Sequence, residues 1–180
     1  MIVAIDTETY KFDEKDGVYR PVLNAREFKL GCVKSDSGIL RFFYEPEDMW
    51  RFLKGLIEKN IKFGKRTFIY GHNIEYDWYA ICKNNLLESD IKYVTFNPFI
   101  AIYKEKGYFL DSMAFYRMSL DRVGNILGFP KGKLPMEVKS MEEVEPYLER
   151  DTEIVLKSIL DLKEKINKLG FRPRDRKSVV

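Results

Sequence analysis

The chain has 180 residues, of which 45% are hydrophobic and 33% charged, and its formal net charge is +3. This length predicts one globular domain with an ordinary core, and the composition excludes a disordered or fibrous chain. The small net charge excludes a basic field over the whole surface, so any contact with nucleic acid needs a local groove.

Cysteine usage and the lack of targeting segments point to the cytoplasm. Cys32 and Cys82 are the only cysteines, which is too few for a disulfide scaffold or a zinc site. We expect two buried thiols in a reducing compartment. The N-terminus carries no basic-then-apolar signal, and no apolar run is long enough to span a bilayer.

The N-terminal part of the chain predicts strands. Residues 1–5 form an apolar run that ends at Asp6, as expected for a buried strand whose C-terminal end carries polar groups. Residues 28–34 and 39–44 are two further strand candidates. The Ser-Asp-Ser-Gly sequence at 35–38 between them predicts a hairpin.

Helices and strands then alternate. Apolar residues at helical spacing after a proline predict a helix over 47–59, followed by a strand at 67–70 and a helix over 76–87. Three more strands are expected, at 92–96, 99–104 and 108–111.

The C-terminal part is mainly helical. We expect a short helix at 120–127, a loop at 129–135 and a long helix over 141–169. Residues 1–170 are therefore expected to form one domain with helices packed on both faces of a mixed sheet. Residues 171–180 are expected to form a basic polar tail.

The first acidic motif is Asp6-Thr7-Glu8, directly after the first strand. Side chains two residues apart on an extended chain point to the same side, so the two carboxylates lie together. Like charges beside a core cost free energy unless a cation offsets them, and hard oxygen ligands favour Mg²⁺ or Mn²⁺. Alone, an Asp-x-Glu motif at a strand end is more often an ordinary solvated turn.

Two further motifs add an acidic residue each. Asp77 falls in the first turn of the second predicted helix, where capping is the alternative role, and Asn73 precedes it as a turn residue. Tyr147 and Asp151 lie four residues apart on the last helix and share a face. The alternative for that pair is an ordinary surface contact.

The three motifs occur in the order Asp-x-Glu, Asn-x-x-Tyr-Asp and Tyr-x-x-x-Asp. This resembles the Exo I, Exo II and Exo III motifs of the DnaQ-like 3′–5′ exonucleases, in the variant with a tyrosine in the third motif (DEDDy). The resemblance covers roughly the first five sixths of the chain. The histidine variant is excluded, because Pro146 occupies the position where that variant has its histidine.

Within this group, the chain is most similar to the proofreading exonuclease domain of family B DNA polymerases, especially the protein-primed type. The segments that carry this likeness are Phe109-Leu110-Asp111-Ser112, Met118-Ser119-Leu120 and Lys131-Gly132. In that group a lysine upstream of the third motif assists catalysis. Lys131 is the nearest match, and Lys133 is the alternative. The chain is too short for the polymerase domains themselves.

The resemblance implies an RNase H-like three-layer α/β/α fold with a mixed five-stranded sheet and a β-hairpin insertion. It also implies two Mg²⁺ or Mn²⁺ ions held by four carboxylates, with Asp6, Glu8 and Asp151 at the ion that activates water and Asp77 supporting the second. Tyr147 would orient the attacking water rather than act as a base, because the free pKa of a phenol is near 10.

The implied activity is removal of 5′-mononucleotides from a single-stranded DNA 3′ end, with a DNA polymerase or replication complex as an expected partner. Thr7, Asn73 and Tyr76 are the substrate-binding candidates that the motifs imply, and Phe115 is added as an aromatic on which a base could stack. The alternatives are an RNase D-like RNA exonuclease and a non-catalytic nucleic-acid-binding module. A solvated tail is the favoured role of the basic C-terminal residues, with phosphate contact as the alternative: Arg172, Arg174, Arg176 and Lys177.

Overall fold

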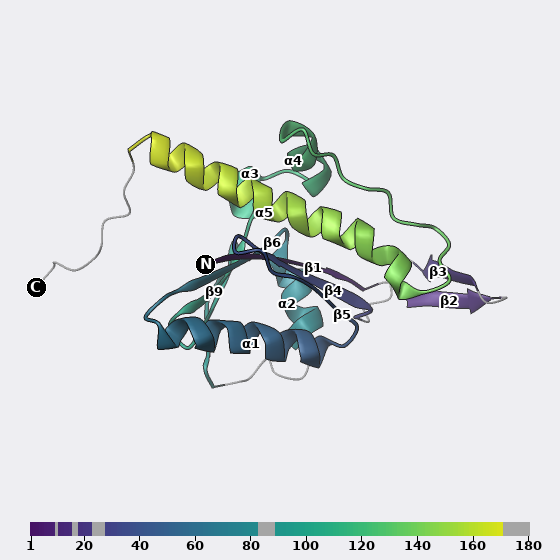
Figure 1. Ribbon diagram of the computed structural model, residues 1–180, viewed down its shortest axis with the longest axis horizontal. Coiled ribbons are helices and arrows are strands. Elements are labelled where there is room, and N and C mark those ends of the chain that lie inside the picture. Colours follow the sequence, from purple (N-terminus) through teal and green to yellow (C-terminus); the bar gives the residue numbers. More distant parts are fainter. Residues whose placement is uncertain (10, 16–17, 23–27, 83–88, 171–180) are drawn as a thin grey trace, which may run out of the picture.

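The computed structural model describes residues 1–9, 11–15, 18–22, 28–82 and 89–170 (Figure 1). The expected C-terminal tail therefore lies outside the described residues. A mixed sheet forms the middle of the molecule, and helices cover both of its faces. This arrangement agrees with the α/β class that the sequence predicts.

The central sheet has seven strands in the order β5-β4-β1-β6-β9-β8-β7. The strands β1, β6 and β9 run parallel to one another, and the remaining neighbours pair antiparallel. The strand bounds are β1 (Ile2–Glu8), β4 (Leu30–Ser35), β5 (Leu40–Phe43), β6 (Thr67–Gly71), β7 (Ile91–Phe96), β8 (Phe99–Tyr103) and β9 (Gly107–Asp111).

The expected number of five strands is wrong. All seven segments predicted as strands join one sheet, because β8 pairs with residues 107–110 of β9 and β7 then pairs with β8. A separate two-stranded hairpin, β2 (Lys11–Lys15) with β3 (Val18–Val22), lies between β1 and β4 in the chain. The sequence pattern had assigned no strand to either of these segments.

The helices agree with the predicted segments more closely in position than in length. Their bounds are α1 (Pro46–Lys62), α2 (Ile74–Cys82), α3 (Met113–Tyr116), α4 (Leu120–Ile126) and α5 (Glu145–Lys168), with a 3₁₀ turn η1 (Met141–Val144) before α5. The helix α2 begins two residues earlier than expected, and the predicted part at 83–87 lies outside the described residues. The short α3 was not predicted.

The two faces of the sheet bury different helices because side chains alternate along each strand. From β1, Val3 and Ile5 pack in the cluster that contains residues of α1 and α2. Ile2 and Ala4 pack instead with Val155 and other residues of α5. The next residues continue this alternation, so the side chains of positions 6 and 8 face α5, and that of position 7 faces α2.

The parallel strands end at one edge of the sheet. Glu8, Gly71 and Asp111 are the last residues of β1, β6 and β9, and Gly71 lies beside Asp111 in register. Polar groups at these three ends therefore gather on one side of the molecule. Within the described ranges, no helix combines the length and apolar character that a membrane crossing needs.

Candidate metal centre

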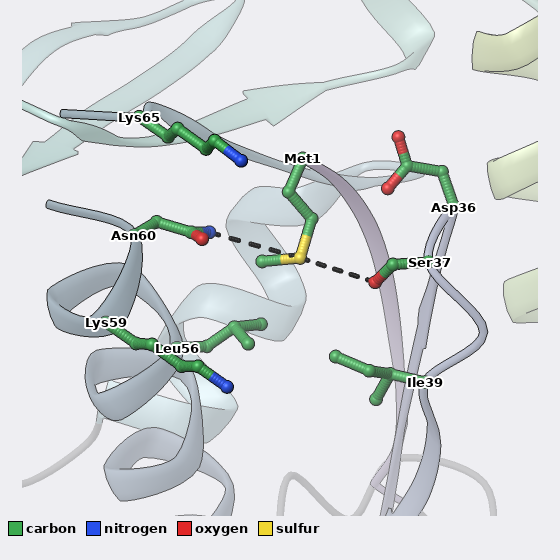
Figure 2. Close-up of a pocket in the computed structure, with 8 residues that line it drawn as sticks. All are labelled: Met1, Asp36, Ser37, Ile39, Leu56, Lys59, Asn60 and Lys65. Carbon is green, nitrogen blue, oxygen red and sulfur yellow. Dashed lines mark hydrogen bonds between the residues drawn. The ribbon is translucent and has the colours of Figure 1, made fainter. Parts of the chain in front are cut away.

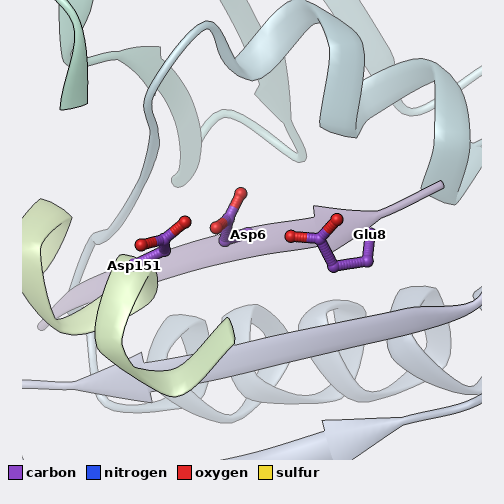
Figure 3. A group of neighbouring side chains, drawn as sticks. All are labelled: Asp6, Glu8 and Asp151. Atoms are coloured by element: carbon purple, nitrogen blue, oxygen red, sulfur yellow. The ribbon is translucent and has the colours of Figure 1, made fainter. Parts of the chain in front are cut away.

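Three carboxylates meet where the first strand passes the last long helix. Asp6 and Glu8 come from β1 and Asp151 from α5, and one oxygen of each lies within 4.8 Å of the others (Figure 3). Helix α5 packs across β1 and β4, which brings residue 151 to residue 6 although 145 residues separate them in the chain. The Asp-x-Glu spacing on β1 and the position of α5 across that strand together bring the three carboxylates into one group.

The cluster opposes ionisation of its own members. Desolvation by the surrounding protein, and then the charges of Asp77, Glu8 and Asp151, raise the pKa of Asp6 well above its usual value. Glu8 is 7% exposed, and desolvation followed by the charge of Asp151 raises its pKa from 4.5 to about 8. A bound cation would relieve the repulsion between these crowded carboxylates, which otherwise hold protons near neutral pH.

Asp77, at the first turn of α2, is not part of this group of three but lies close enough for its charge to raise the pKa values of Asp6 and Glu8. Thr7 Oγ1 donates a hydrogen bond of 2.7 Å to Asp77 Oδ1, which ties the helix to the strand that carries Asp6. Desolvation raises the pKa of Asp77 to about 7, although the hydrogen bond from Thr7 opposes the shift. A Cβ at Gly71 would lie 3.0 Å from Asp77 Oδ2, so the glycine leaves room for this carboxyl group.

A lysine and a tyrosine complete the centre. Lys131 Nζ lies 2.7 Å from Asp151 Oδ2 and 5.1 Å from the centre of the Tyr147 ring. Burial lowers the pKa of Lys131, but the interactions with Asp151 and Tyr147 together outweigh burial and leave the pKa raised, so the lysine is cationic. Lys133, the alternative from the sequence, is exposed. Burial raises the pKa of Tyr147, which keeps its phenol protonated at neutral pH.

The residues present fit a divalent cation of the Mg²⁺ or Mn²⁺ type. Asp151 Oδ1 is buried and has no hydrogen-bond partner within the part of the chain that the structure describes, which costs free energy unless a ligand takes it up. All the candidate donors are carboxylate oxygens, the ligands that hard cations prefer. The Cys32 thiol is a poor metal ligand, because burial raises its pKa to about 12 and keeps it protonated.

The substrate-binding candidates differ in exposure. Thr7 is buried and bonded to Asp77. Tyr76 is 45% exposed and shares a hydrogen bond with Thr9. Asn73 is exposed and has a φ of 64°, and Phe115 on α3 is 54% exposed. The basic C-terminal residues of the sequence prediction lie outside the described residues.

Several residues that support this edge had no assigned role in the sequence reasoning. Asp111 Oδ1 accepts hydrogen bonds of 2.9 Å from the backbone N–H groups of Asn73 and Met113. His72 bridges Ser112 Oγ, at 3.0 Å from its Nδ1, and the Met118 carbonyl oxygen, at 2.9 Å from its Nε2. The position of Asp111 at the end of an apolar strand is the signal that could have found it.

A pocket lies at the opposite end of β1 and shares no residue with the carboxylates (Figure 2). Its volume is about 380 Å³. The Met1 sulfur accepts hydrogen bonds from Ser37 Oγ at 3.6 Å and Asn60 Nδ2 at 4.0 Å. Its lining is a mixture of apolar and charged side chains, without a group of convergent carboxylates: Met1, Asp36, Ser37, Ile39, Leu56, Lys59, Asn60 and Lys65.

Comparisons with known proteins place the fold. No protein-family model matches the chain, and no curated protein sequence matches it. Among solved structures, the chain is similar to a family B DNA polymerase from the hyperthermophilic archaeon Pyrobaculum calidifontis, with a TM-score of 0.53 and 19% sequence identity. The match covers 92% of this chain and 24% of the polymerase chain. The fold is thus one that occurs as part of a DNA polymerase, and an acidic cluster able to bind a metal lies within it.

Proposed function

We propose that the chain is a metal-dependent 3′–5′ exonuclease of the DnaQ-like, DEDDy type with an RNase H-like fold. It hydrolyses single-stranded DNA, or frayed 3′ ends, to 5′-mononucleotides. The observation that carries the proposal is the convergence of Asp6, Glu8 and Asp151 within 4.8 Å, with Tyr147 and Lys131 beside them. Residues from a strand, a loop and a helix meet there.

The proposed ligands of two Mg²⁺ or Mn²⁺ ions are Asp6, Glu8 and Asp151, with Asp77 supporting the second ion. The unsatisfied Asp151 Oδ1 and the raised pKa values of Asp6 and Glu8 support this assignment. Bound divalent cations lower the pKa of a coordinated water and neutralise charge that develops on a phosphodiester.

Two side chains beside the carboxylates, Tyr147 and Lys131, stay protonated and orient neighbouring groups. Tyr147 keeps its phenolic proton and can donate a hydrogen bond that orients a water molecule, but it is too weak a base to deprotonate one. Lys131 holds Asp151 through Oδ2 and leaves Oδ1 for another ligand. The cationic lysine also offers a positive charge to a phosphate.

The proposed substrate is DNA. The fold occurs within a DNA polymerase, and exposed aromatic side chains on α2 and α3, Tyr76 and Phe115, can stack on bases. A DNA polymerase or replication complex is the corresponding partner, and proofreading, DNA replication or DNA repair is the corresponding role. An exonuclease acts at a strand end, and Tyr76, which is exposed and adjacent to Asp77 in the chain, would contact the terminal nucleotides.

The test is digestion of matched DNA and RNA oligonucleotides labelled at either end, with Mg²⁺, Mn²⁺ or EDTA. We expect a ladder from 5′-labelled DNA, immediate release of mononucleotide from 3′-labelled DNA, and no cleavage in EDTA. Faster digestion of RNA would move the proposal to an RNA exonuclease. Binding of DNA without cleavage by the wild-type protein would refute the enzymatic assignment.

A further inference from the structure

The segment that carries Lys131 leaves α4 in a fixed direction. Gly128 has a φ of 66° and donates its N–H to the Asn125 carbonyl oxygen at 3.1 Å. Phe129 donates its N–H to the Gly124 carbonyl oxygen at 2.8 Å. These two bonds form a Schellman motif, which ends the helix and sets the path of the next residues.

Gly124 lets this segment lie directly on the end of α4. A Cβ at that position would be 2.7 Å from the Phe129 carbonyl oxygen and 3.0 Å from Ile154 Cδ1. Contacts that short do not occur with a backbone oxygen, so the path of the loop requires a residue without a side chain. Helix α4, the loop and α5 therefore pack together at this point.

The Phe129 ring is held by two cations from α5. Arg150 Cζ lies 3.8 Å and Lys157 Nζ 3.5 Å from the ring centre. Residues seven apart on a helix share a face two turns apart, so the ring lies along the helix between them. Asp151 is next to Arg150 on the same helix. The attraction of a cation to an aromatic face is directional and fixes the ring against α5.

Lys131 follows two residues after this anchor. Pro130 between them has a fixed φ, which limits how the lysine can move relative to the ring. On its other side, a Cβ at Gly132 would lie 3.5 Å from Tyr147 Cδ2. The loop is thus held at Phe129 and packed against Tyr147, and Lys131 Nζ meets Asp151 Oδ2 between these contacts.

We propose that Phe129 is a positioning residue, whose ring, held by Arg150 and Lys157, keeps the Lys131 ammonium at Asp151 in the catalytic centre. This role rests on the exonuclease function proposed above. The Phe129 side chain has no atom that could bind a metal ion, so Phe129 acts through the lysine. A leucine at position 129 keeps an apolar side chain but offers no aromatic face to the two cations, whereas a tyrosine keeps that face.

The kinetic test measures single-turnover cleavage and oligonucleotide binding separately for Phe129→Leu and Phe129→Tyr. We expect Phe129→Leu to slow cleavage about tenfold, because a misplacement of about 1 Å near reacting atoms can cost up to about a hundredfold. Binding and the Phe129→Tyr rate should stay within about twofold of wild type. Phe63→Leu is the matched control, since Phe63 is 70% exposed at the end of α1 on the other face of the sheet.

The decisive comparison repeats Phe129→Leu in a Lys131→Met background. If Phe129 acts through Lys131, adding Phe129→Leu to the Lys131→Met protein slows cleavage by less than about twofold more, because effects on one shared interaction are not additive. An equal loss in both backgrounds would mean a general structural role and would overturn the proposal. So would an unchanged rate in Phe129→Leu alone.

Hydrogen exchange of residues 129–135 tests the anchor without any need for nuclease activity. Faster exchange in this segment is expected for Phe129→Leu but not for Phe129→Tyr or Phe63→Leu. Unchanged exchange in Phe129→Leu would overturn the proposal. A wild-type protein that cleaves no DNA, in contrast, would refute the proposed function. The exchange result would still show whether Phe129 anchors the loop.

Discussion

Replacing Glu8 by glutamine removes one charge from the carboxylate cluster and nearly preserves the side-chain shape. Desolvation and the Asp151 charge raise the pKa of Glu8 from 4.5 to about 8. The folded protein therefore binds a proton here more tightly than the unfolded chain does. The resulting stability is fully present below about pH 4.5 and is lost as the pH rises through about 8.

The size of the effect follows from that difference. Between 4.5 and about 8, at about 1.4 kcal/mol for each pH unit, the ionised Glu8 costs the metal-free protein about 4 to 5 kcal/mol. Glutamine cannot ionise and avoids this cost. For a domain of this size, a change of about 1 kcal/mol moves Tm by about 2 to 4 °C, so we expect Glu8→Gln to raise Tm by about 10 °C at pH 9.

The assay is thermal unfolding in EDTA at pH 5 and pH 9. At pH 5, wild-type Glu8 is largely protonated in the folded state, and the two proteins should melt within about 3 °C of each other. Glu105→Gln, at an exposed turn, is the control and should not show this dependence on pH. A lower Tm for Glu8→Gln at pH 9, or the same change at both pH values, would refute the electrostatic reasoning.

Three further predictions concern the same centre. Asp6→Ala should reduce Mn²⁺-dependent cleavage of a labelled oligonucleotide by more than about a thousandfold, while Tm in EDTA stays unchanged or rises because a crowded anion is removed; retained activity would contradict the metal assignment. Tyr147→Phe should slow single-turnover cleavage less than Asp151→Ala does, because the phenol only orients water; equal losses would show that its role is misread. Lys131→Met should slow cleavage at least about tenfold and Lys133→Met less than about twofold, because of these two lysines only Lys131 contacts Asp151; the reverse order of rates would mean that Lys133 is the assisting lysine.

The buried strands of the fold could be predicted from the sequence. The apolar run before Asp6 and the run at 67–70 both form central strands, β1 and β6, because only a buried strand is apolar on both faces. The resemblance implied a β-hairpin insertion without a position, and the residue pattern predicted no strand at β2 or β3, because their sequence is rich in charged residues and includes Pro21.

The number of strands in the sheet depends on pairing rather than on local pattern. The segments of β7 and β8 were predicted as strands, but only the register between β8 and β9 decides that they extend the main sheet. Pairing between segments is a tertiary property, and no periodicity within one segment encodes it.

For the metal centre, the sequence indicated which residues could bind a cation but not how the loop that carries Lys131 would lie. Asp6 and Glu8 on one strand were expected to point together, and the structure has them in one cluster with Asp151. The choice between Lys131 and Lys133 had no periodic signal, since glycine and proline surround both. The choice depends on how Phe129 packs against Gly124 of α4 and against α5, which a one-dimensional pattern does not contain.

Diffraction from a crystal soaked in Mn²⁺ is the sharpest test of whether separate parts of the chain form one divalent-cation site. We expect an anomalous scattering peak with oxygens of Asp6, Glu8 and Asp151 at about 2.0 to 2.4 Å, the range for hard cations bound by carboxylates. The peak should be absent in Asp6→Ala crystals. No Mn²⁺ at these carboxylates at millimolar concentration, or a fully occupied ion elsewhere instead, would refute the proposed metal site.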